Sequence, residues 1–398
     1  MPHGLTVLIL SMLLGLQPVT TDLYLPALPA LTEGFGASMA QAQLTLTALL
    51  LAFGLSQLIW GPLSDRFGRR PILLVGLSAY VLASIGSTMA ATMDTLIVWR
   101  TIQGAAMGAA VMCARAIVRD LYTPLQGARI MSKGLSGLGL TACISPPLGG
   151  LLANLFSWRA SLLVLTVFGA ASLALIALRF RETLPQKNLQ ALQPVSLLRT
   201  WLTILRNPTF IAYAMLSMAS YGGLFTFLAS SSFVFIKVLG LSTTDCGLLI
   251  FSGAFTYLLG TFLCRRLLAR FDVRRTVAIA AVLSLSGGTL MGVLAMAGWH
   301  SSWAIMPAFC LFMLGHGILQ PCSHSAAVGP FPQSAGAASA LNGFLMMLVA
   351  FLIGNWLGTH MDGTIFPLVY GIWFWSAMVA LVAWTLVQRQ GRRSESRA

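Results

Sequence analysis

The longest stretch of the chain without Asp, Glu, Lys or Arg is residues 276–361, TVAIAAVLSLSGGTLMGVLAMAGWHSSWAIMPAFCLFMLGHGILQPCSHSAAVGPFPQSAGAASALNGFLMMLVAFLIGNWLGTHM. A membrane-spanning helix needs about 20 mostly apolar residues, so this stretch is long enough for about three crossings. In hydrocarbon every backbone N–H and C=O must bond within the protein, which leaves helices or closed barrels. The stretch lacks the short alternating strands of a barrel and therefore predicts transmembrane helices.

The rest of the chain has the same character. Of its 398 residues 57% are hydrophobic and 9% are charged, with a mean hydropathy of +0.83. Soluble domains carry about 25% charged residues, so lipid must be the solvent for most of the exterior. Further charge-free runs are 72–93, 134–158, 160–178 and 207–236. We predict an all-α membrane protein with twelve transmembrane helices, at 5–30, 41–63, 72–92, 95–117, 128–153, 159–180, 208–236, 242–268, 275–297, 303–326, 336–360 and 365–387.

The Lys and Arg residues that give the chain its net charge of +14 cluster in alternate loops, which argues against nucleic acid as a partner. Lys and Arg mark cytoplasmic loops, so both termini are expected in the cytoplasm. Loop 328–335 departs from the pattern because it has no basic residue. No basic region precedes the first apolar run, so we expect that helix to be retained. The basic clusters are Arg66, Arg69 and Arg70; Arg115, Arg119, Arg129 and Lys133; Arg179, Arg181, Lys187, Arg199 and Arg206; Arg265, Arg266, Arg270, Arg274 and Arg275; and Arg389, Arg392, Arg393 and Arg397.

The chain divides into two halves that resemble each other. The longest polar stretch, residues 181–206, lies between the sixth and seventh predicted helices. The Arg-Phe pairs that begin at Arg66 and Arg270 are 204 residues apart, in loops of equivalent position. Internal duplication of this kind is typical of secondary transporters, in which substrate binds between the halves near the midplane. We predict a six-helix bundle at 1–180, a cytoplasmic linker at 181–207, a six-helix bundle at 208–387 and a cytoplasmic tail at 388–398.

One loop carries a specific signature, Gly61-Pro-Leu-Ser-Asp65-Arg66-Phe-Gly68-Arg69-Arg70-Pro71. It resembles the loop 2–3 motif of the major facilitator superfamily, GxLxDRxGRR, and matches every position. Gly61 is expected to allow close approach of a neighbouring helix, and a carboxylate such as Asp65 is stabilised at a helix N-terminus. The resemblance implies that this N-terminus belongs to helix 336–360 and that the contact holds the cytoplasmic side shut. The alternative is a basic loop that only fixes topology.

Asp22 is the one acid well inside a predicted helix, in the sequence TDLYLPALP at 21–29. An ionised carboxylate there costs several kcal/mol, so it must be paired or protonated for part of the time. We therefore predict that Asp22 carries the coupling proton. In the alternative, Asp22 lies nearer the outer surface and caps a helix break caused by Pro26 and Pro29.

Arg100 is the predicted counter-charge for Asp22. It begins the sequence Arg100-Thr-Ile-Gln103-Gly104-Ala-Ala-Met-Gly108-Ala-Ala, which is similar to the family motif RxxQGxGAA with the glycine spacing shifted by one. Because arginine does not lose its proton in proteins, a buried Arg100 needs an acceptor or an anion. The alternative is an interfacial arginine whose head extends out to water.

Helix 128–153 contains Pro146, Pro147, Gly149 and Gly150, a combination that allows bending and close packing. It is similar to the motif associated with drug–proton antiporters, which implies a seal against proton leak. Together with residues 21–29 and the sequence PFPQSAGAASALNG at 330–343, it resembles the Bcr/CflA subfamily of drug-resistance carriers. That resemblance covers the whole chain and implies phenicols, bicyclomycin-like compounds or sulfonamides as substrates.

The substrate cavity is predicted from aromatic and polar residues inside apolar helices, because drug-sized pockets mix aromatic groups with a few polar ones. The alternative for each is packing against lipid or another helix. The candidates are Tyr24, Tyr221, Phe225, Asn342 and His316.

The sequence predicts no cofactor. The six cysteines lack metal-ligand spacing, and no GxxxxGK[ST] loop for ATP is present. The expected partners are a small-molecule substrate, protons and the lipid bilayer, with the chain a monomer in a bacterial inner membrane. We therefore predict proton-coupled export of small amphipathic molecules. A nutrient transporter for nucleosides or amino acids is the main alternative, and a membrane enzyme or a sensor is less favoured.

Overall fold

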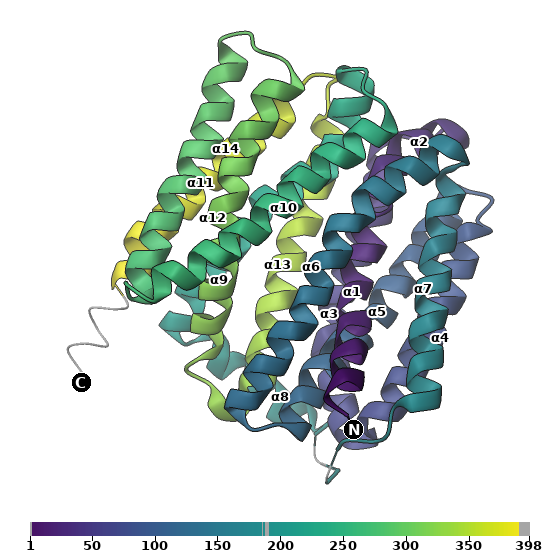
Figure 1. Cartoon of the computed structure of the whole chain (residues 1–398), viewed down its shortest axis with the longest axis vertical. Helices are drawn as coiled ribbons and strands as arrows, with labels where there is room; N and C mark the ends of the chain where they lie inside the picture. Colours follow the sequence, from purple (N-terminus) through teal and green to yellow (C-terminus); the bar gives the residue numbers. More distant parts are fainter. Residues whose placement is uncertain (1, 185, 188–190, 390–398) are drawn as a thin grey trace. The chain divides into compact units, whose positions relative to one another are not determined.

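A computed structural model describes residues 2–184, 186, 187 and 191–389. This part of the chain forms helices joined by turns and loops, and it contains no strand. Twelve helices in this part of the chain are long and apolar enough to cross a membrane, as predicted. In chain order the helices are α1 (His3–Asp22), η1 (Leu25–Ala27), α2 (Leu28–Phe35), α3 (Met39–Phe67), α4 (Arg69–Thr88), α5 (Met93–Leu121), α6 (Pro124–Leu155), α7 (Trp158–Arg179), α8 (Pro194–Leu205), α9 (Pro208–Ser232), η2 (Phe233–Val238), α10 (Thr243–Leu268), α11 (Val273–Met296), α12 (Ser302–Val328), η3 (Pro332–Ser334), α13 (Ala335–His360), α14 (Phe366–Val382) and η4 (Ala383–Val387) (Figure 1).

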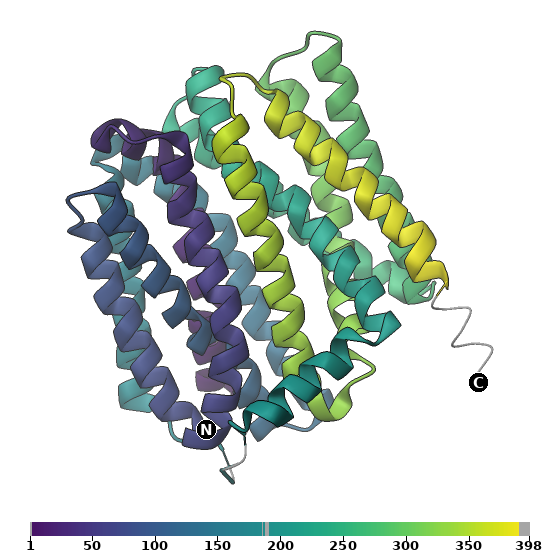
Figure 2. The ribbon, with the colours of Figure 1, turned by 180° about the vertical axis from the view of Figure 1, so that it is seen from behind.

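The chain forms two compact units, residues 1–199 and 200–398. In unit 1, α3 packs on α5, α4 on both α5 and α7, and α1 on α6. In unit 2 the equivalent helices repeat these pairs, since α10 packs on α12, α11 on both α12 and α14, and α9 on α13. Each unit is therefore a six-helix bundle with the same internal order, seen from behind in Figure 2.

The segment predicted as a linker, 181–207, contains helix α8, and the boundary between the units falls inside this helix. Most of the predicted tail, from residue 390 onward, lies outside the described residues.

The first membrane span is broken, whereas the sequence predicted one helix. Helix α1 ends at Asp22, and the chain continues through η1 into α2. Pro26 and Pro29 have no N–H to donate to the preceding turn, which explains the break. The break leaves Asp22 at the carboxyl end of α1.

At the start of several helices a side chain accepts a hydrogen bond from a free backbone N–H group and so caps the helix. Ser38 and Gln41 form a capping box at the start of α3, and the Asn207 side chain accepts from the N–H groups of Thr209 and Phe210 at the start of α9. Between α10 and α11 the Asp272 side chain accepts from Arg275 N–H, and its other oxygen lies 3.4 Å from Arg274 Nε. This acidic–basic pair is partly exposed.

Candidate functional site

Asp22 is partly buried at the end of α1. The Thr21 hydroxyl lies 2.7 Å from Asp22 Oδ1 and can donate to it, and it lies 3.0 Å from the Gln17 carbonyl. No ion pair among the described residues includes Asp22. The carboxyl end of a helix carries partial negative charge, so the backbone at this position does not offset a second negative charge.

Arg100 is fully buried on α5 and contacts α1 next to Asp22. Its Nη2 donates to the Thr20 carbonyl at 3.0 Å, and its Nη1 donates to Gln103 Oε1 at 2.6 Å. The guanidinium also lies 4.5 Å from the centre of the Tyr24 ring, a cation–π contact. The positive charge of Arg100 is thus stabilised by a backbone carbonyl, a side-chain amide and the face of an aromatic ring.

Among the described residues no ion pair within 4.0 Å joins Arg100 to Asp22, and the role of Arg100 as a counter-charge stays a prediction. The register of α5 on α1 places the guanidinium at Thr20, two residues before Asp22. Polar groups of one further helix, α4, complete this layer. The Thr20 hydroxyl lies 2.6 Å from the Tyr80 hydroxyl, and the Gln103 amide donates to the Ser84 hydroxyl at 2.6 Å.

The signature loop between α3 and α4 forms a buried charge network. Arg69 is 1% exposed, and its Nη1 lies 2.7 Å from Asp65 Oδ1 while its Nε lies 2.8 Å from Asp120 Oδ2. Its Nη1 also donates to the Ser64 hydroxyl at 2.6 Å. Asp65 has a second, more exposed partner in Arg119 at 3.4 Å. Asp120 was not predicted, although it is an acid inside the basic cluster that ends α5.

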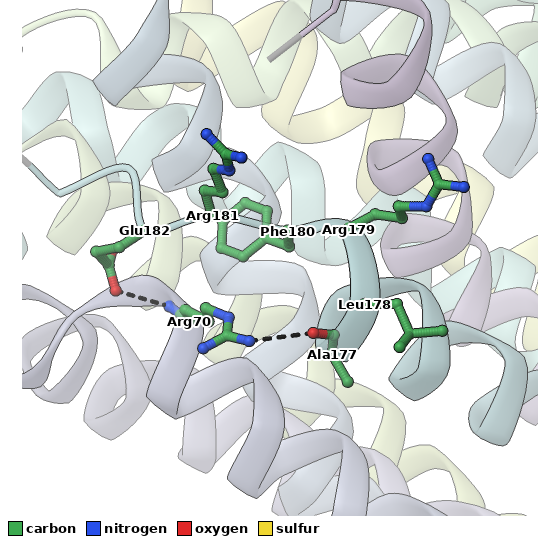
Figure 3. A pocket seen from close by; sticks show the side chains of 7 residues that line it. All are labelled: Arg70, Ala177, Leu178, Arg179, Phe180, Arg181 and Glu182. Atoms are coloured by element: carbon green, nitrogen blue, oxygen red, sulfur yellow. Dashed lines mark hydrogen bonds between the residues drawn. The ribbon is translucent and has the colours of Figure 1, made fainter.

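Glu182, just after α7, holds the start of α4. Its two oxygens accept from the backbone N–H groups of Arg69, at 2.9 Å, and Arg70, at 3.1 Å. Figure 3 shows the bond to Arg70. Partial burial would raise the pKa of Glu182, but backbone donors from Leu184, Arg69, Arg70 and Thr183 outweigh it and hold the pKa below its ordinary value. Glu182 was also missed by the sequence analysis, because its partners are more than a hundred residues away along the chain.

The other signature residues have smaller roles in unit 1. Gly68 has φ 110°, a conformation that favours glycine, at the junction of α3 and α4. Arg70 Nη2 donates to the Ala177 carbonyl at 3.1 Å, at the edge of a hollow of about 420 Å³ (Figure 3). Arg66 lies 5.5 Å from the Phe67 ring centre. Within unit 1, a Cβ at Gly61 would meet only the Met112 side chain among the described residues, at an ordinary 3.5 Å, and the close approach of helix 336–360 to Gly61 stays a prediction.

Helix α6 passes beside Asp22. Pro146 and Pro147 lie inside this continuous helix, and Gly149 and Gly150 are buried. A Cβ at Gly149 would collide with the Leu23 carbonyl oxygen. The α6 backbone therefore approaches the chain directly after Asp22 as closely as only glycine permits.

Replacing Gly149 with alanine is expected to lower stability by about 1–3 kcal/mol, because the Leu23 backbone cannot move without displacing the α1–η1 break. The measurement is the melting temperature of the purified protein in detergent. Gly61→Ala is the matched control, because its added methyl group has room and alanine is the better helix former. Equal melting temperatures for the two variants would contradict the close contact.

The remaining cavity candidates fall in different places. Tyr24 belongs to unit 1, where its hydroxyl lies 3.0 Å from the Thr45 hydroxyl. His316 is buried in unit 2, with Nδ1 2.8 Å from the Ser220 hydroxyl. Phe225 is buried, with its ring stacked on half-buried Tyr221 at 6.4 Å. Asn342 is fully buried on α13, and its amide nitrogen lies 3.2 Å from His324 Nδ1.

The cysteines show no metal centre in the described part of the chain, where no three His, Cys, Asp or Glu side chains gather. All but Cys310 are buried, and Cys264 and Cys322 have their sulfur atoms 3.6 Å apart as free thiols.

Comparisons with known proteins cover almost the whole chain. Residues 10–354 match the family model described as Major Facilitator Superfamily. The chain is 30% identical over 338 residues to multidrug resistance protein D of Escherichia coli, covering 85% of this chain and 84% of that protein. It is 26% identical to a bicyclomycin resistance protein homolog of Haemophilus influenzae, covering 92% and 91% of the two chains. It is 27% identical to a chloramphenicol resistance protein of Pseudomonas aeruginosa, covering 87% and 83%.

Among solved structures, a D-xylose-proton symporter superimposes with a TM-score of 0.75 at 17% identity, covering 96% of this chain and 97% of that one. At this identity the likeness concerns the fold alone. It agrees with the twelve-helix architecture built from the sequence.

Proposed function

We propose that this chain, which belongs to the major facilitator superfamily, exports small amphipathic molecules in exchange for protons. The family consists of multi-pass membrane transporters, so the chain is a transporter and not an enzyme. The site of action is a bacterial inner membrane, with both termini in the cytoplasm. Transport proceeds by alternating access, in which the protein opens to one side of the membrane at a time. A monomer in the lipid bilayer suffices for this cycle.

The observation that carries the proposal is the position of Asp22, a carboxyl group inside the first membrane span whose one side-chain partner in the described part of the chain is the Thr21 hydroxyl. Asp22 takes up a proton when the protein is open to the periplasm. It releases the proton when the protein is open to the cytoplasm and substrate binds. Arg100, held on the Thr20 carbonyl, supplies the nearby positive charge that stabilises the ionised carboxylate.

The network around Arg69 supports a conformational role for the signature loop. It joins α3, α4 and α5 through Asp65 and Asp120, and Glu182 adds the end of α7. These contacts tie four helices into one block, as a rocking motion of whole units requires.

The proposed substrates are of the phenicol, bicyclomycin or sulfonamide class. Relatives carry the names of multidrug, bicyclomycin and chloramphenicol resistance. The alternative, a nutrient transporter for nucleosides or amino acids, is compatible with the same fold.

Proteoliposomes with an acidic lumen in an alkaline buffer test the proposal. An exchanger accumulates chloramphenicol in the lumen as protons leave, and an ionophore that dissipates the pH gradient stops this accumulation. We expect accumulation only with this gradient. Accumulation of uridine or chloramphenicol only with the opposite gradient identifies a symporter and contradicts export, and saturable binding without any flux identifies a sensor.

A further inference from the structure

Helix α12 carries a line of polar side chains within an apolar span. His316, Gln320 and His324 are spaced by four residues, so they share one face of the helix. Neither α12 nor its neighbours α9 and α13 contain any Asp, Glu, Lys or Arg. Helices α10 and α11, which also pack on α12, carry such residues only in their first or last turns. Any ligand of this face therefore meets neutral polar groups in apolar surroundings.

Asn342 of α13 has half of its amide unsatisfied. Its nitrogen contacts His324 Nδ1 at 3.2 Å and the Met346 sulfur at 3.9 Å, while its Oδ1 is buried without a hydrogen-bond partner. Exchanging the amide O and N would turn the oxygen toward His324 and leave the nitrogen unsatisfied instead. Either orientation leaves one buried polar atom of a fully buried side chain without a partner.

Gln320 presents the complementary group. Its Nε2 is buried and lacks a partner, one helical turn from His324. The His324 ring is itself fixed, with Nε2 3.2 Å from the Ser339 hydroxyl and Nδ1 at Asn342. An unsatisfied donor thus lies one helical turn before His324 on α12, and an unsatisfied acceptor lies on the α13 side chain that contacts His324.

Buried polar groups without a partner destabilise the folded state, and folded proteins pair nearly all of them. Two complementary ones around one ring indicate a bound molecule that supplies the missing partners. A ligand with a permanent charge is disfavoured, because these three helices offer no opposite charge to offset its desolvation.

We propose that Asn342 and Gln320, positioned around His324, form a cargo subsite for an uncharged group with an N–H or O–H donor beside a carbonyl, as in an amide, lactam or imide. The ligand's donor binds Asn342 Oδ1, and its carbonyl accepts from Gln320 Nε2. The assignment of this ligand as cargo rests on the proposed function, whereas the chemistry of the subsite rests on the two unsatisfied atoms.

Equilibrium binding to the full-length protein in lipid nanodiscs tests the subsite without any proton gradient. The probes are chloramphenicol and uridine, each with a methylated form that lacks one N–H or O–H donor, and the cation tetraphenylphosphonium. The variants are Asn342→Leu and Gln320→Leu. Asn355→Leu is the matched control, the same change at an exposed position of the same helix.

For at least one neutral probe, we expect Asn342→Leu and Gln320→Leu each to weaken binding about tenfold. Methylation of the donor should weaken binding to the wild type by a similar factor but have no further effect in Asn342→Leu, the signature of a direct contact. Asn355→Leu should bind like the wild type. Asn342→Leu also removes the contact with His324 Nδ1, so the melting temperature of each variant is measured beside its binding. A tenfold loss of binding with a melting temperature within a few degrees of the wild type separates lost binding from misfolding.

The subsite is overturned if neither neutral probe binds the wild type more tightly than it binds Asn342→Leu, or if tetraphenylphosphonium shows the same tenfold loss. Failure of proton-driven flux with the binding pattern intact would overturn the proposed function and leave the subsite standing. Proton-driven flux without weaker binding in either leucine variant would overturn the subsite and leave the proposed function standing.

Discussion

Asp22→Asn is expected to reduce proton-driven efflux to the level of empty liposomes. Asparagine keeps the shape of the protonated carboxyl group but cannot release a proton, so the two fluxes lose their link. Because the protonated form also belongs to the cycle, the variant should still exchange labelled for unlabelled substrate across the membrane without a pH gradient. Both rates can be measured on one preparation of proteoliposomes.

Glu33→Gln is the control for Asp22→Asn. Glu33 lies in α2 of the same membrane span, but it is exposed, so loss of its charge should leave proton-driven efflux near the wild-type rate. If Asp22→Asn pumps as fast as the wild type, Asp22 is not the proton carrier. If it loses exchange as well as efflux, the defect lies in folding or binding, and the carrier role is likewise unsupported.

Arg69→Ala is expected to destabilise the protein by about 3–5 kcal/mol, because it leaves the buried Asp120 and the partly buried Asp65 without their shared cation. In detergent this should appear as a fall of roughly 10 °C in melting temperature and a lower yield of folded protein. The melting temperature of Arg69→Lys should lie between those of the wild type and Arg69→Ala, since lysine carries the charge but cannot bond two carboxylates with one planar group.

Arg66→Ala is the matched control for Arg69→Ala, three residues earlier in the same loop, where the arginine lies over the Phe67 ring. Its melting temperature should remain within a few degrees of the wild type. Adding Asp120→Ala to Arg69→Ala should restore part of the lost stability, because it removes a carboxylate that has become unpaired. No restoration, or an equal loss in Arg66→Ala, would show that the buried ion pairs do not determine the stability of this loop.

The twelve helices and the family were predictable from the sequence, because long apolar runs and a contiguous motif are local features. The partners of Arg69 were not, since Asp120 and Glu182 lie 51 and 113 residues away and only packing brings them together. The bonding partner of Arg100 was not predictable for the same reason. Composition indicates that Arg100 needs an acceptor, but the register of two helices decides that the Thr20 carbonyl provides it.

The break after Asp22 was foreseeable as an alternative, because two prolines follow closely. What the sequence did not reveal is the partner of the break, the α6 backbone at Gly149. A glycine in a proline-rich helix indicates some close contact, and only the three-dimensional arrangement identifies which one.

The duplicated halves have diverged in how they treat charge. The turn between α3 and α4 keeps a nearly inaccessible arginine between acids, while the turn at the same place in the second copy has the partly exposed Asp272–Arg274 pair, of the kind that contributes about 0–1 kcal/mol. After an ancestral gene doubled, natural selection would thus act strongly on one descendant loop and weakly on the other. Mutational tolerance should be unequal along the chain, with residues 265–275 accepting substitutions that residues 64–70 reject.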